Sequence, residues 1–377
     1  MNQKPPFRAE HVGSLLRPKV LHDARAAFDG DLTKPVRSGE KRSSPELKPI
    51  EDAAIREAVA LQERAGLQSI TDGEYRRRSW YQDFVLGLDN TAIRFEVGPL
   101  SFADYQGNRA PSPRIYIEGK LSRKQPIMVD AFTFLKGATK GTPKVTMPAP
   151  SELHFFGGRD VIDRKAYPDL EELWADLAAI YRAEIADLAK AGCTYFQLDN
   201  CSFPLLCDPK FQSAFKAIGE DPQKLIDGYV GVINAALEGR PAGSTFGMHL
   251  CRGNNRGKWL GEGGYDYVAS MVFERVNVDA FFLEYDTPRA GDFSPLKHVP
   301  KGKHVVLGLV SSKVPDLESA ESLKGRIKEA EKHIALDQLC LSPQCGFASN
   351  FLGNPLTVAD EEAKLRRIVE VADSVWH

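Results

Sequence analysis

Short apolar runs rich in β-branched and aromatic residues alternate along this chain with longer stretches whose apolar positions recur at helical spacing. Runs of this length predict strands, and the longer stretches predict amphipathic helices. The candidate strands are residues 11–14, 68–72, 144–147, 194–199, 245–250, 279–285, 304–311 and 338–342. Strands that alternate with helices through a whole chain predict an α/β fold with a parallel sheet.

The stretches between the candidate strands carry clear helical stripes. One stripe runs from Leu170 to Leu188 and ends at Gly192, a residue type that commonly terminates helices. Others lie at residues 323–334 and 365–375. Strand and helix repeated in this way predict a (β/α)₈ TIM barrel that forms a single domain over residues 1–377. A Rossmann fold is disfavoured, because no Gly-x-Gly-x-x-Gly follows the first candidate strand.

Two segments interrupt the alternation. Residues 30–49 contain Pro35, Pro45 and Pro49 among many charges, which predicts an exposed connection. Residues 85–143 are rich in Gly, Pro and aromatic residues and include the β-prone Arg114-Ile115-Tyr116-Ile117. We expect this second segment to form a β-rich insertion after the second barrel strand, such as a hairpin, and not a separate domain.

The composition narrows the class of protein. The 377 residues are 42% hydrophobic and 27% charged, with a formal net charge of −2, which is typical of a soluble domain and argues against nucleic-acid binding. The absence of a long apolar run and of a signal peptide predicts no membrane association. Six cysteines are too few for a disulfide framework, which favours the reducing cytoplasm. The oligomeric state stays open, with a homodimer as one option.

Four potential metal ligands lie at or just beyond the ends of predicted strands. His249 and Cys251 end one strand, Glu284 lies near the end of the next, and Cys345 follows the last. Because residues i and i+2 of a strand point to the same side, His249 and Cys251 can reach one ion. The alternative for each cysteine is an ordinary buried role. Together, the imidazole, two thiolates and a carboxylate suit tetrahedral Zn²⁺.

The proposed ligand set also indicates a reaction. Zinc held by two thiolates and a carboxylate carries excess negative charge, which makes it a poor activator of water. It suits the binding of an incoming thiol, whose pKa the metal lowers so that a nucleophilic thiolate exists at neutral pH. This ligand chemistry predicts transfer of an alkyl group to a thiol.

Other polar side chains are expected at the same mouth, because chemistry in TIM barrels gathers at the carboxyl ends of the strands. Ser14, Glu74 and Asp199 follow or end candidate strands. Asp72 fits a turn or helix cap as well as it fits a functional site. His11 fits either a structural role or a place in the substrate site.

At this point the motifs resemble those of the cobalamin-independent methionine synthase family, in particular its catalytic C-terminal barrel. The resemblance extends from residues 11–14 to the closing helix and is greatest to short single-barrel members. The family's His-x-Cys, Glu and Cys ligands fall on His249, Cys251, Glu284 and Cys345, the last within Ser342-Pro343-Gln344-Cys345-Gly346. The resemblance implies a zinc-dependent methyltransferase of methionine biosynthesis that acts on homocysteine.

The resemblance also carries over the pocket for homocysteine. The family's Gly-Ser, Gly-Glu and Gln-x-Asp motifs match Gly13-Ser14, Gly73-Glu74 and Gln197-Leu198-Asp199. It implies that Ser14 contacts the substrate carboxylate, and that Glu74 and Asp199 are catalytic residues that hold the ammonium. We add His11 to this expected substrate site.

The chain departs from the family pattern on the side of the methyl donor. Asn200-Cys201 replaces Glu-Pro, the pterin-stacking tryptophan expected after Thr146 is missing, and Val310 stands where the family has its proton-shuttle histidine. The N-terminal half of full-length synthases has no counterpart in this sequence. We therefore expect slow or no turnover with methyltetrahydrofolate, and leave folate, corrinoid and other donors open.

Three other functions are weighed against this one. An epoxyalkane:coenzyme M transferase type would use a sulfonated thiol, but Glu74 and Asp199 favour a substrate with an ammonium group. A metal-free lyase similar to uroporphyrinogen decarboxylase would not need the four ligands. A purely structural zinc site would leave the two carboxylates without a purpose.

Overall fold

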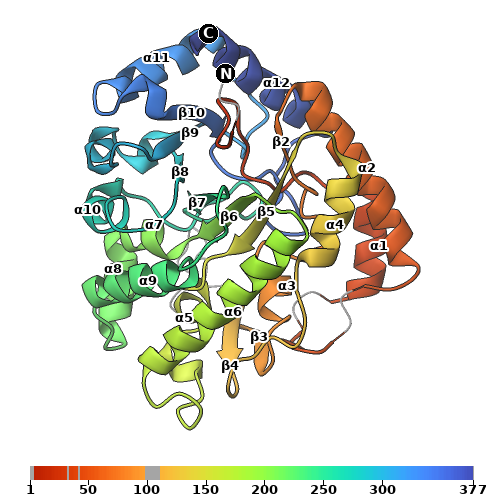
Figure 1. Cartoon of the computed structure of the whole chain (residues 1–377), viewed down its shortest axis with the longest axis vertical. Coiled ribbons are helices and arrows are strands. Elements are labelled where there is room, and N and C mark those ends of the chain that lie inside the picture. Colours follow the sequence, from red (N-terminus) through yellow and green to blue (C-terminus); the bar gives the residue numbers. More distant parts are fainter. Residues whose placement is uncertain (1–3, 32–33, 41–42, 98–110, 377) are drawn as a thin grey trace.

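A computed structural model describes residues 4–31, 34–40, 43–97 and 111–376. Seven parallel strands form the main sheet in the spatial order β10-β9-β8-β7-β6-β5-β2. Their bounds are β2 Ser69–Ile70, β5 Thr142–Pro148, β6 Tyr195–Asn200, β7 Thr245–Leu250, β8 Ala280–Glu284, β9 His304–Val310 and β10 Leu339–Pro343. The sheet is curled, and helices surround its outer face (Figure 1).

In the described residues, at least one α-helix separates each pair of consecutive main-sheet strands except β8 and β9. Their bounds are α1 Lys19–Asp29, α2 Leu47–Ala65, α3 Gln82–Val85, α4 Val129–Ala138, α5 Glu152–Phe155, α6 Leu170–Lys190, α7 Ser202–Leu206, α8 Pro209–Ala217, α9 Pro222–Ala236, α10 Ala269–Val272, α11 Ala320–Glu331 and α12 Val358–Val375. Helix α6 begins where the Asp169 side chain accepts hydrogen bonds from the Glu171 and Glu172 amides. None of these helices is both long and apolar enough to cross a membrane.

Successive side chains of each strand lie on opposite faces of the sheet, so they form two layers. Tyr195, Phe282, Val306 and Cys340 form a small cluster on the inner face of the curled sheet. Alternating residues such as Phe196 belong to the larger core between the sheet and the helices. The strands are buried on both faces, as expected of a parallel sheet. Positions 199, 249 and 284 therefore lie on the inner face, near the carboxyl ends of β6, β7 and β8.

Residues 11–14, which were predicted as the first strand, do not form a regular strand. The segment makes a single parallel bridge, Ala9 with Leu341 of β10. Its other neighbour is the segment after β2, where the Leu15 amide donates to the Gly73 carbonyl over 3.1 Å. Gly13 has a φ of +143°, which interrupts regular strand geometry. The described residues thus show a parallel sheet of seven strands, and not eight.

The predicted β-rich insertion contains a hairpin. Strands β3 Thr91–Glu96 and β4 Ser112–Ile117 pair antiparallel, and β1 Val36–Arg37 adds a third strand beside β3. Residues 30–49, expected to be an exposed connection, therefore also contribute to this small sheet. It lies apart from the main sheet in Figure 1, next to α3 and α5.

Candidate metal centre and adjoining cavity

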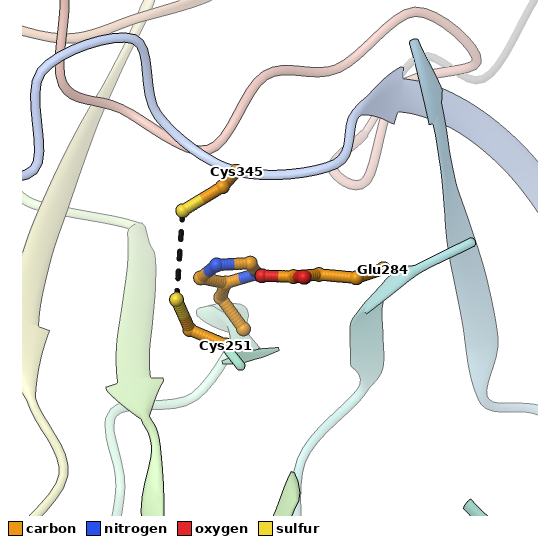
Figure 2. Close-up of side chains that lie close together, drawn as sticks. Cys251, Glu284 and Cys345 are labelled. Atoms are coloured by element: carbon orange, nitrogen blue, oxygen red, sulfur yellow. Dashed lines mark hydrogen bonds between the residues drawn. The ribbon is translucent and has the colours of Figure 1, made fainter. Parts of the chain in front are cut away.

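Four side chains meet at the carboxyl ends of β7, β8 and β10. One ligand atom from each of His249, Cys251, Glu284 and Cys345 lies within 4.8 Å of the others, and all four residues are buried. Figure 2 shows that Cys251, Glu284 and Cys345 come from separate segments of the chain. The strand register explains the meeting, because β7 pairs with β8, and β8 with β9, which pairs with β10.

The contacts within this cluster fit a metal ion. The two sulfurs lie 3.6 Å apart, and the His249 Nδ1 atom lies 3.3 Å from the Phe282 carbonyl. The His249 Nε2 atom is buried without a hydrogen-bond partner among the described residues. A buried polar atom with no partner is costly in a folded protein, and a metal ion would satisfy it. Two thiolates, an imidazole and a carboxylate are a donor set that zinc prefers.

The carboxylate of Glu284 is held by two further groups. Its Oε1 accepts from the Arg252 amide over 3.1 Å, and its Oε2 pairs with Arg289 over 2.9 Å. Arg289 also pairs with Asp286 over 2.8 Å. Asp286 therefore supports Arg289 and is absent from the ligand cluster.

The hydrogen bond with Cys251 and the adjacent His249 ring hold the pKa of the Cys345 thiol well below its usual value, against the opposing effect of burial. Cys251 in turn contacts Cys201, a third thiol at the same place, and this contact contributes most to raising the Cys251 pKa. Cys201 was not recognised as a site residue from the sequence. Its position two residues after Asp199, the last inner-face residue of β6, was the available signal.

A cavity of about 340 Å³ adjoins the cluster. Its wall includes His249, Cys251 and Cys345, while Glu284 lies behind the wall with no exposed surface. Ser14, Glu74 and Asp199, three of the residues expected at the substrate, also line it. The structure thus brings six of the eight expected site residues to one cavity wall. They are Ser14, Glu74, Asp199, His249, Cys251 and Cys345.

Glu74 is held in an unusual backbone conformation, with a φ of +62°. Its amide donates to Asp72 over 2.9 Å, so Asp72 forms the turn. The Oε1 atom accepts from Thr146 over 2.8 Å and lies 3.5 Å from the Arg77 guanidinium. The Oε2 atom has no hydrogen-bond partner among the described residues. Burial raises the pKa of Glu74 and so disfavours its charged form, and a cationic partner near Oε2 would favour that charged form again.

Asp199 lies across the cavity wall on β6, opposite His249 in the strand register. Gln197, two residues earlier on the same face, donates a hydrogen bond of 2.7 Å to its Oδ1 atom. Burial, followed by the charge of Glu74, raises the pKa of Asp199 to about 7. Two buried carboxyls that repel each other form a strong site for an ammonium group.

Ser14 and His11 differ in their positions. Ser14 packs so closely on Gly346 that a Cβ atom at Gly346 would lie 1.9 Å from the serine oxygen. His11 does not line the cavity. Its Nε2 atom lies 3.1 Å from the Ser69 carbonyl, between the inner-face residues of the sheet. This position suits a structural role, and the expected place of His11 in the substrate site stays a prediction.

Another part of the cavity wall is aromatic. Trp80, Tyr81 and Phe156, which we name the aromatic group, pack on one another with ring centroids 4.9 to 6.0 Å apart. Phe95 and Phe351 line the cavity as well. The sequence reasoning missed these residues. The pair Trp80-Tyr81, just after the second strand end, was the signal that could have indicated them.

Comparison with known proteins shows which sequences this chain resembles. Residues 249–374 match the family model described as the cobalamin-independent synthase catalytic domain. The uncharacterized protein YxjH of Bacillus subtilis is 40% identical, and the match covers 99% of this chain and 96% of YxjH.

Two solved structures are similar over nearly their whole length. One, from Listeria monocytogenes, is described as a candidate vitamin-B12-independent methionine synthase. It is 34% identical with a TM-score of 0.75, covering 100% of both chains. The other, a B12-independent methionine synthase from Shewanella sp. bound to selenomethionine, has a TM-score of 0.72 at 20% identity, covering 98% of this chain and 97% of that one. The chain belongs to the cobalamin-independent methionine synthase family.

Proposed function

We propose that this chain is a zinc-dependent thiol methyltransferase that methylates homocysteine and so produces methionine. The observation that carries the proposal is the buried His249, Cys251, Glu284 and Cys345 cluster, which adjoins a cavity with two carboxyls in its wall. A structural zinc site would not need such a cavity. The selenomethionine bound to the Shewanella relative is consistent with a methionine-like product.

Different residues of the cavity would bind different groups of the thiol substrate. Glu74 and Asp199 would hold the substrate ammonium, and Ser14 would contact its carboxylate. Zinc bound by the four ligands would supply a positive charge that lowers the pKa of the substrate thiol. Arg289 would keep the Glu284 carboxylate oriented through its 2.9 Å contact. The substrate would thus be fixed at both ends of its amino-acid group.

We also propose how the chain is organised. Residues 8–15, which contact both β10 and the segment after β2, would take the eighth strand position of a TIM barrel. Residues 1–377 would form one domain with the insertion at 85–143. The six cysteines are free and buried, which suits a reducing compartment such as the cytoplasm. A homodimer remains the assembly we would test first.

The function is tested by metal analysis and a defined alkylation assay. The purified protein should hold about one zinc per chain. It should convert homocysteine and methyl iodide into methionine faster than zinc-depleted protein does, with activity restored by added zinc. A parallel assay with coenzyme M, which has no ammonium, should be much slower. Equal rates with and without zinc would overturn the proposal. A higher rate with coenzyme M than with homocysteine would show that homocysteine is not the substrate.

A further inference from the structure

The aromatic group lies close to the reaction centre. The Trp80 amide donates to the Ser349 carbonyl over 2.9 Å, and the Ser349 hydroxyl lies 3.6 Å from the Cys345 sulfur. Trp80 is therefore tied to the loop that carries a metal ligand. Trp80 and Phe156 are only partly buried, and both line the cavity. Their rings thus bound space that is continuous with the ligand cluster.

The described lining residues offer no free cation to an anionic donor. Glu74 and Asp199 are acidic, and Arg78 is the one Lys or Arg residue that lines the cavity within the described chain. The Arg78 guanidinium is already engaged, since its Nε donates to Asp29 over 2.9 Å. An anionic donor would thus find no free cation among these lining residues. Aromatic faces attract cations, and Trp attracts them most strongly.

The charge of the donor decides whether its leaving group needs a proton. The carboxyls of Glu74 and Asp199 are assigned to the substrate ammonium, which keeps them ionised. A donor whose methyl group sits on a neutral amine needs protonation as it leaves. A sulfonium or quaternary ammonium donor leaves as a neutral molecule and needs none.

We propose that the aromatic group is a subsite for an alkyl donor whose methyl group is attached to a positively charged sulfur or nitrogen. The inference rests on the proposed function and names its second substrate class. The thiolate sulfur of homocysteine attacks the methyl carbon, and a new sulfur–carbon bond forms as the donor bond breaks. The electron pair of that bond stays on the donor atom, giving a neutral thioether or tertiary amine. The thiol proton has passed to solvent.

The test compares a charged donor with an uncharged one on the zinc-loaded enzyme. Trimethylsulfonium carries the positive charge, whereas methyl iodide delivers the same methyl group without it. Trp80→Leu should lower kcat/KM for trimethylsulfonium by about tenfold, while the rate with methyl iodide stays unchanged. Trp80→Phe, which keeps an aromatic face, should retain most of the sulfonium activity. Zinc content is measured for each variant.

A matched tryptophan serves as the control. Trp376 packs on Arg8 and donates to the Leu336 carbonyl, remote from the cavity, so Trp376→Leu should leave both rates unchanged. A fall in both rates for Trp80→Leu would show a general structural role and overturn the inference. Wild-type turnover with methyl iodide but none with trimethylsulfonium or a quaternary ammonium donor would also overturn it, while leaving the thiol methyltransferase intact. If the wild-type enzyme alkylated homocysteine with none of these donors, the proposed function itself would be refuted.

Discussion

At the scale of single residues, the two thiolates determine whether metal is held. Cys251→Ser and Cys345→Ser should each lose most of the zinc and the activity together, because a hydroxyl is a far poorer zinc ligand than a thiolate. Metal analysis of the purified variants measures this. Cys193→Ser is the matched control, since the buried Cys193 thiol donates to the Tyr195 carbonyl over 3.4 Å and a hydroxyl can do the same. Stoichiometric zinc in both ligand variants would refute the assignment.

Substitution of either carboxyl should weaken substrate binding and leave metal binding unchanged. Glu74→Gln and Asp199→Asn should weaken homocysteine binding by about 2–5 kcal/mol, because each removes a desolvated charge opposite the ammonium. Zinc content should stay unchanged, since neither residue belongs to the ligand cluster. A sulfonated thiol without an ammonium is the control ligand. Equal losses for both ligands in calorimetric titrations would contradict the assignment.

The raised pKa of Asp199 predicts how binding depends on pH. Burial and Glu74 raise this pKa to about 7, so the carboxyl gains a proton as the pH falls below that value. A protonated Asp199 no longer attracts an ammonium. Methionine, which has no thiol to titrate, should therefore bind more weakly at a pH of about 6 than at about 8. Asp199→Asn should flatten this dependence, and a flat wild-type profile would count against the role of Asp199.

At the scale of elements, most of the main sheet was predictable. Strands β6, β7 and β9 differ from the predicted ranges by at most one residue at either end, because each is a short run rich in apolar residues between polar or turn residues. The ligand positions followed from those strand ends. The position of His11 could not be predicted in this way, because residues 11–14 do not form a regular strand whose alternation would show which way the ring points.

Long-range contacts explain what the sequence could not indicate. Residues 7–11 are held against the sheet by Glu10, which accepts from the Ser69 and Tyr195 hydroxyls over 2.7 and 2.8 Å. The Lys144 ammonium lies 3.4 Å from Glu10 and also donates to the His11 carbonyl. These partners are 59 to 185 residues apart from Glu10 in sequence. No local pattern records such a network.

This buried network should make a measurable contribution to stability. Lys144→Met should lower the free energy of unfolding by about 3–5 kcal/mol, because it leaves the Glu10 carboxylate buried without its cation. Urea unfolding measures the change. Lys190→Met breaks an exposed pair with Asp187 and should cost less than about 1 kcal/mol. A double variant, Glu10→Gln with Lys144→Met, should recover part of the loss. Full stability of Lys144→Met alone would show that the network is dispensable.

At the scale of the whole molecule, the cavity joins two surfaces of different origin. The strand ends of the main sheet supply the ligands and Asp199, and the turn after β2 supplies Glu74, whereas residues further along that segment and the end of α5 supply the aromatic group. The family motifs that match the metal ligands and the substrate pocket all lie on the first surface, and none of them falls on the aromatic group. The thiol side and the donor side are therefore expected to differ in how far they follow other family members.

The donor side leads to the last prediction. Methyltetrahydrofolate carries its methyl group on a poor amine leaving group that must be protonated. Val310 replaces the expected proton-shuttle histidine, and it is buried and apolar. Turnover of homocysteine with free methyltetrahydrofolate should therefore be slow or absent, whereas donors that leave without a proton should react. Methylcobalamin, trimethylsulfonium and methyltetrahydrofolate are compared side by side at equal concentrations, with methionine measured by mass spectrometry. Efficient, saturable turnover with methyltetrahydrofolate would mean that another group in the cavity supplies the proton, and Val310→His would then bring no gain.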